Sequence, residues 1–76
     1  MKEKELRIVV AFETTTAAMQ FESHAKCLGI QGRIIPVPRE ITSGCGLSFS
    51  TPIGERKKVE ELVKQLQIGK VYELIL

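Results

Sequence analysis

The stretch Arg-Ile-Ile-Pro-Val-Pro at residues 33–38 decides the fold, because it reads as a strand that contains two prolines. Pro36 and Pro38 are two positions apart, so the amide hydrogens that they lack are missing from the same side of the strand. A central strand loses two ladder hydrogen bonds in this way, whereas an edge strand loses none. Residues 33–38 are therefore predicted to form an edge strand whose outer side faces solvent.

The segments on either side of this strand show two different hydrophobic patterns. Short β-branched or alternating runs are typical of strands, and apolar residues at helical spacing, ended by a glycine, are typical of helices. The hydroxyls of Thr14, Thr15 and Thr16 are suited to cap the first helix. The further predicted strands are residues 6–12, 47–51 and 70–76, and the predicted helices are residues 14–28 and 55–67.

The order of elements is therefore βαββαβ, which predicts an α+β, ferredoxin-like fold for a single domain over residues 1–76. In this arrangement the four-stranded antiparallel sheet has the order 4-1-3-2, with both helices on one face. That order places the proline-bearing second strand at an edge. It also brings the end of the first strand, the threonine-rich start of the first helix and the start of the third strand to one pole of the domain.

Composition excludes several function classes. The chain has 76 residues and a net charge of +2 with both signs interspersed, which indicates no nucleic-acid partner. No apolar run approaches the ~20 residues that span a membrane. A charged start without a secretory signal predicts a cytoplasmic location, where the two cysteines stay reduced. So small a domain has little room for a deep cavity, so neither a complete multi-step active site of a self-sufficient enzyme nor a cofactor is expected.

Cys45 is the main candidate for chemistry, because glycines flank it on both sides. Gly44 and Gly46 carry no side chains that would shield the sulfur, which predicts an exposed, reactive thiol. A helix N-terminus and a nearby guanidinium from Arg39 both favour a thiolate over a thiol. Arg39 has an alternative interpretation as a solvated charge paired with Glu40. The residues expected around the thiol, through their hydroxyls or backbone amides, are Thr14, Thr15, Thr16, Ser43, Gly44 and Gly46.

Two weaker patterns point elsewhere. His24 and Cys27 are three positions apart on the first predicted helix, but a structural zinc site needs four ligands, so no metal is expected and Cys27 is assigned to packing. The sheet face that contains Ser48 and Ser50 is expected to lack the aromatic residues with which related folds stack RNA bases. That open face is instead a candidate surface for a homodimer.

The chain resembles a small bacterial family of selenium/sulfur (Se/S) carrier-like proteins, formerly a domain of unknown function. The resemblance rests on residues 32–47, which include Pro-Val-Pro-Arg-Glu-Ile followed by Cys-Gly, and on Phe-Glu-Thr-Thr-Thr at residues 12–16. It implies that Cys45 accepts sulfur or selenium as a persulfide or perselenide. It also implies a donor of the cysteine desulfurase type and an enzyme that accepts the cargo. The alternatives from the residues themselves are a thiol redox or regulatory module and an inert interaction domain.

Overall fold

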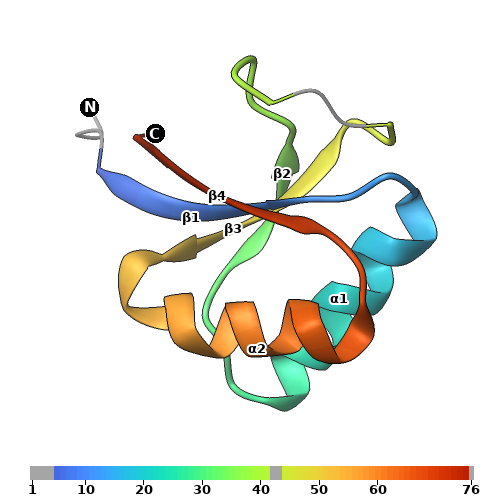
Figure 1. Cartoon of the computed structure of the whole chain (residues 1–76), viewed down its shortest axis with the longest axis vertical. Helices are drawn as coiled ribbons and strands as arrows, with labels where there is room; N and C mark the ends of the chain where they lie inside the picture. The colour runs from blue at the N-terminus through green and yellow to red at the C-terminus, as the bar shows by residue number, and fades with distance from the viewer. Residues whose placement is uncertain (1–4, 42–43, 76) are drawn as a thin grey trace.

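Figure 1 shows a four-stranded sheet with both helices on one of its faces, in a computed structural model that describes residues 5–41 and 44–75. The predicted βαββαβ order is confirmed, with a 3₁₀ turn added before the second helix. The elements are β1 Leu6–Ala11, α1 Thr15–Cys27, β2 Arg33–Pro36, β3 Leu47–Pro52, η1 Ile53–Glu55, α2 Arg56–Leu66 and β4 Lys70–Ile75. Ser43, expected in the binding loop, and Leu76, expected in the last strand, lie outside the described residues.

The sheet has the predicted topology, and the proline argument explains its edge. Its order is β2-β3-β1-β4, and each neighbouring pair is antiparallel. After β2, the Val37 amide donates to the carbonyl of Gly46 at 3.0 Å, toward the β3 side. Because successive amides point to opposite sides of an extended chain, the nitrogens of Pro36 and Pro38 face outward. The two prolines therefore remove donors only where no strand is paired.

The main core lies between the sheet and the two helices. Its centre is a row of three aromatic rings, in which Phe21 of α1 lies 5.3 Å from Phe12 and 5.3 Å from Phe49, measured between ring centroids. Val59 and Leu62 of α2 are buried against the same cluster. The helical apolar stripe seen in the sequence thus faces the sheet. The fully or nearly buried members of this cluster are Ile8, Val10, Phe12, Ala18, Phe21, Ala25, Ile30, Phe49, Val59 and Leu62.

The opposite face of the sheet is covered by the chain itself, which corrects the expectation of an open face. Ser48 and Ser50 are buried, and Ile41, from the segment after β2, packs on Val9 of β1. Tyr72 lies on this face as well, since it is paired with Val9 across the β1–β4 ladder. The expectation that this face has no aromatic residue was therefore wrong. The error arose because the register between the first and last strands determines the sheet face on which Tyr72 lies, and this register cannot be read from the sequence.

In the part of the chain that the structure describes, no helix is both long and apolar enough to cross a membrane.

Candidate functional site

Cys45 lies just before β3, with its sulfur turned toward the end of β1. The Sγ atom is 3.3 Å from the carbonyl oxygen of Phe12, to which it donates, and it accepts from the Leu47 amide at 3.3 Å. A further carbonyl, that of Leu47, lies 3.6 Å from Sγ. The side chain packs against the helix-side core and is half-buried. Cys45 is therefore less exposed than the sequence predicted, because the strand end offers the sulfur backbone partners.

The backbone around Sγ matches both hydrogen-bonding roles of the Cys45 side chain. A thiol has one S–H donor and a weak acceptor, and here the two roles are matched by the Phe12 carbonyl and the Leu47 amide. Cys45 is therefore held by the backbone in a defined orientation.

Both flanking glycines are required by the local geometry, Gly44 by the lack of space for a Cβ atom and Gly46 by its backbone conformation. A Cβ atom on Gly44 would lie 2.8 Å from the carbonyl oxygen of Glu13, so this position lets the loop pack directly on the β1–α1 corner. Gly46 has φ = +74°, a left-handed conformation that is unfavourable for residues with side chains. These two constraints fix the peptide on each side of Cys45.

The start of α1 lies beside the same loop. Thr14 is the N-cap, and its hydroxyl accepts from the amide of Ala17 at 3.1 Å. Thr15 and Thr16 are exposed in the first turn, which has no acidic side chain. Since Gly44 packs on Glu13, the loop and the helix start meet at one pole. The Thr14 hydroxyl oxygen is used by the helix itself, as the acceptor of the N-cap hydrogen bond.

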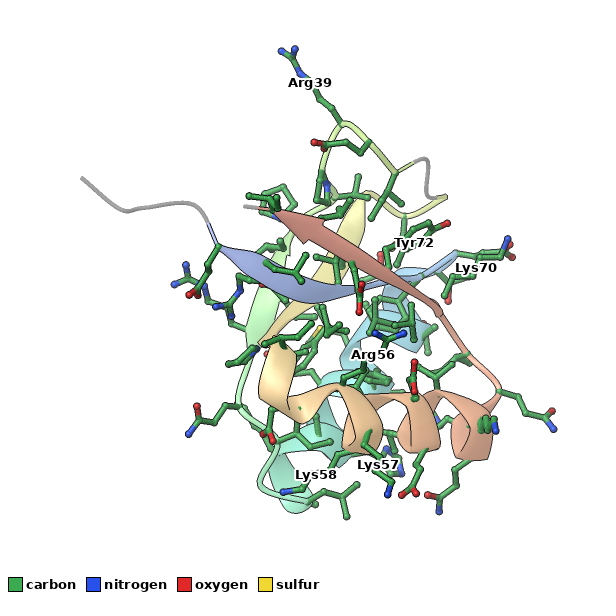
Figure 2. The ribbon with its side chains drawn as sticks, turned by 60° about the vertical axis from the view of Figure 1, so that its left-hand side comes forward. Arg39, Arg56, Lys57, Lys58, Lys70 and Tyr72 are labelled. Atoms are coloured by element: carbon green, nitrogen blue, oxygen red, sulfur yellow. The ribbon has the colours of Figure 1, made fainter. Side chains whose placement is uncertain are left out.

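A cleft of about 450 Å³ opens beside Gly44, the residue before Cys45, between the β1–α1 corner and the segment that leads into β4. Figure 2 shows Lys70 and Tyr72 of β4 pointing to the same side of the domain. Sequence reasoning missed both residues, although Lys70 is paired with Ala11, the last residue of β1, and so had to lie near the site. The lining residues are Ala11, Phe12, Glu13, Thr14, Ala17, Gly44, Gln67, Ile68, Gly69, Lys70 and Tyr72.

Arg39 is not brought to the thiol. Figure 2 shows its side chain pointing away from the domain at the tip of the loop after β2. Among the described residues it makes no hydrogen bond or ion pair, including with Glu40, and both side chains are exposed. Arg39 is thus a solvated charge in this structure, although the proposed pairing with Glu40 is not formed.

Cys27 and His24 lie at the other end of α1, and Cys27 is exposed. The assignment of Cys27 to packing was wrong, because the last residue of α1 lies off the buried stripe and faces solvent. The ring of His24 is bonded through Nδ1 to the carbonyl of Gln20 at 2.9 Å. Within residues 5–41 and 44–75, no group of three or more His, Cys, Asp or Glu side chains is placed to hold a metal ion.

Comparison with known proteins gives one family and no individual relative. No curated protein and no solved structure matches the chain significantly. The model of the family described as "Putative Se/S carrier protein-like" matches residues 7–73, which include every described strand and helix except the ends of β1 and β4. The cradle of Cys45 and the cleft beside it both lie inside this match, and the chain belongs to this Se/S carrier-like family.

Proposed function

We propose that this protein carries sulfur or selenium on Cys45, as a persulfide or perselenide, and delivers it to an acceptor enzyme. The observation that supports the proposal most directly is the cradle of Cys45, in which Sγ lies between the Phe12 carbonyl and the Leu47 amide. Family membership supports the same cargo. A fixed, half-buried thiol without a catalytic neighbour among the described residues suits a carrier, which has to hold cargo and needs no chemistry of its own.

The transfer needs no oxidant. The sulfur of Cys45 attacks the outer, sulfane sulfur of a donor persulfide, so a new S–S bond forms and the donor S–S bond breaks. The donor sulfur leaves as a thiolate and takes up the proton that Cys45 gives up. The products are a Cys45 persulfide and a donor thiol, and the redox state of the pair is unchanged. Delivery to the acceptor is the same exchange in reverse, and selenium in the outer position follows the same scheme.

The backbone contacts of Cys45 fit both states of such a carrier. Before loading, the S–H donates to the Phe12 carbonyl, which holds the thiol in a defined orientation. After loading, Sγ has no hydrogen and gives up this contact, while its lone pairs still accept from the Leu47 amide. The inner sulfur therefore stays hydrogen-bonded to the backbone, and the outer sulfur or selenium atom can point away from the core. The cleft beside Gly44 offers space for that atom and for the segment of the donor that brings it.

The donor is proposed to be an enzyme of the cysteine desulfurase type. The test is incubation of the protein with such an enzyme and with cysteine or selenocysteine, followed by intact-mass and peptide mass spectrometry. Because Cys27 is exposed, it can pick up sulfur without any function. The decisive sample is therefore Cys27→Ser, which keeps Cys45 as its one thiol, and its matched control is Cys45→Ser, which keeps Cys27.

The proposal expects Cys27→Ser to gain the mass of one sulfur or selenium atom, removable by a thiol reductant, and to pass it to a second thiol protein. Cys45→Ser should gain much less. Loading that is equal in the two variants would refute the assignment to Cys45. A mixed disulfide with a small thiol on Cys45, without any gain of sulfur or selenium, would instead support the redox or regulatory alternative.

A further inference from the structure

An open groove of about 980 Å³ runs along the β2 side of the sheet, on the face that is turned away from the helices. Its lining comes from β1, β2 and β3 and from the segments next to them, and none of these residues lines the cleft beside Gly44. The register fixes the face, because Arg33 of β2 is paired with Ser50 of β3, which lies on that face. The carrier site therefore leaves this groove unused.

Two arginine side chains come together at one end of the groove. Arg7 of β1 donates through Nε to the hydroxyl oxygen of Ser50 at 2.8 Å, and Ser50 is 4% exposed. Arg33 is the ladder partner of Ser50, so its side chain leaves the sheet on the same face. The buried serine thus lies between the two arginines, and its hydroxyl holds the Arg7 guanidinium over β3, beside Arg33.

The charge of this arginine pair is only partly balanced within the groove. Arg7 forms one ion pair, with Glu5 at 2.8 Å, and Glu5 is the one acidic side chain among the described residues that line the groove. Arg33 is exposed and makes no hydrogen bond or ion pair within the described parts of the chain. Because a guanidinium has five N–H donors, most donors of the pair are open to a carboxylate.

The rest of the groove is mainly apolar and follows β2 toward the loop that carries Cys45. Ile35, Pro36 and Pro38 line this part. A proline has no amide hydrogen, so this wall offers a bound chain apolar contact rather than a ladder of hydrogen bonds. Residues 33–38 span roughly 17 Å when extended, which matches a bound segment of about five residues.

We propose that this groove binds an extended segment of a partner protein in which a glutamate or aspartate stands beside apolar residues. The carboxylate lies between Arg7 and Arg33, and the apolar residues pack along the wall formed by Ile35, Pro36 and Pro38. A small anion would contact the arginines and leave this wall unused, whereas a chain segment uses both. Charge and shape together therefore favour the segment. This binding goes beyond the carrier function and does not depend on it.

The apolar end of the groove lies beside the loop of Cys45. The amide of Val37, between the two prolines of the wall, donates to the carbonyl of Gly46 at 3.0 Å, and Gly46 directly follows Cys45 in the chain. A segment bound in the groove would therefore hold its own protein at the same end of the domain as the thiol. If the proposed function is correct, that protein is the donor or the acceptor of the cargo.

The test is an NMR titration of the isotope-labelled full chain with the acetylated, amidated peptide Pro-Leu-Glu-Glu-Leu-Pro. The palindromic order lets its glutamates reach the arginines in either chain direction. We expect the backbone amide signals of Gly32, Arg33 and Ser50 to shift as the groove fills. The matched peptide Pro-Leu-Gln-Gln-Leu-Pro should bind at least about tenfold more weakly, because it has no carboxylate for the arginines.

A pair of variants separates the groove from the general charge of the protein. Arg33→Gln should raise the Kd of the glutamate peptide about three- to tenfold, since one of the two guanidiniums is lost. Lys64→Gln removes an equal charge from an exposed position on α2 and should leave the Kd unchanged. Equal binding of the two peptides, or an equal effect of the two variants, would overturn the proposal.

The remaining outcomes distinguish other occupants. No shift at about 10 mM peptide, which saturates even a site with a Kd of about 1 mM, would overturn the proposal. Acetate at the same carboxylate concentration tests the anion alone, and an equal affinity would mean that the groove takes a free carboxylate and no segment. Shifts of the same signals on dilution of the protein without peptide would assign the groove to a second copy. None of these measurements involves cargo, so their failure leaves the test of Cys45 unaffected.

Discussion

The two cysteines of this chain differ in their exposure and in the structure that surrounds them. Cys27 is exposed at the end of α1 and has no fixed role in the described structure. Cys45 is half-buried, and its sulfur has a donor and an acceptor on the backbone. Two glycines and a strand end are arranged around Cys45, whereas nothing is arranged around Cys27. The chain therefore constrains the position of Cys45 much more than that of Cys27, and this difference is why Cys45 is the thiol proposed to carry the cargo.

Adding a side chain at Gly44 is expected to have the largest effect on the structure around Cys45. In Gly44→Ala the new Cβ would lie 2.8 Å from the Glu13 carbonyl oxygen, so the loop has to move and unfolding should become easier by about 1–3 kcal/mol. Chemical denaturation measures this loss. Release of the loop should also make Cys45 react faster with iodoacetamide while Cys27 reacts as before.

The matched control for that change is Gly54→Ala. Gly54 has open space around its Cβ position and no positive φ, so this variant should be within about 0.5 kcal/mol of the wild type. An equal loss in both variants would mean that the packing of Gly44 on Glu13 does not matter.

Native alkylation compares the two thiols directly. Cys27 is exposed and Cys45 is half-buried with its hydrogen donated to Phe12, so Cys27 should react faster by roughly tenfold, a difference of about 1.4 kcal/mol in activation free energy. Peptide mass spectrometry after timed quenching gives both rates from one sample. The ratio should fall toward one in denaturant. A faster Cys45 in the native protein would contradict the cradle described here.

Replacing each cysteine by alanine should change the free energy of unfolding by different amounts, and this difference is smaller than the effects above. Cys45→Ala loses two weak hydrogen bonds and its contacts with the helix-side core, which should cost about 1 kcal/mol of stability. Cys27→Ala replaces an exposed helical residue by a better helix former and should change stability by less than about 0.5 kcal/mol. Thermal unfolding of the two variants side by side tests this difference, and a reversed order would mean that the core contacts of Cys45 contribute nothing.

More of the fold than of the candidate site could be predicted from the sequence, and the reason is physical. The parity of Pro36 and Pro38 is a local property, and it sets the edge strand and with it the sheet order. The orientation of Cys45 depends on the Phe12 carbonyl, 33 positions away in the chain, which no local pattern reports. Cys27 was misassigned although its place off the apolar stripe already pointed to solvent. Tyr72 was missed because its face depends on the β1–β4 register.

Arg39 provides the smallest expected effect. The sequence suggested that its charge supports a thiolate at Cys45, but its side chain points away from the domain and makes no hydrogen bond or ion pair with a described residue. Water and salt screen the field of an exposed charge over about 10 Å at 0.1 M ionic strength, so a solvated guanidinium has little influence on a half-buried sulfur. Arg39→Ala should therefore leave the stability, the alkylation rate of Cys45 and its loading with cargo unchanged within error.

If loading from the donor enzyme falls while alkylation by a small reagent is unchanged, Arg39 acts on the protein partner, because only the larger reactant reaches the loop tip. If both rates fall together, Arg39 does act on the sulfur, and the orientation described here is not the reactive one.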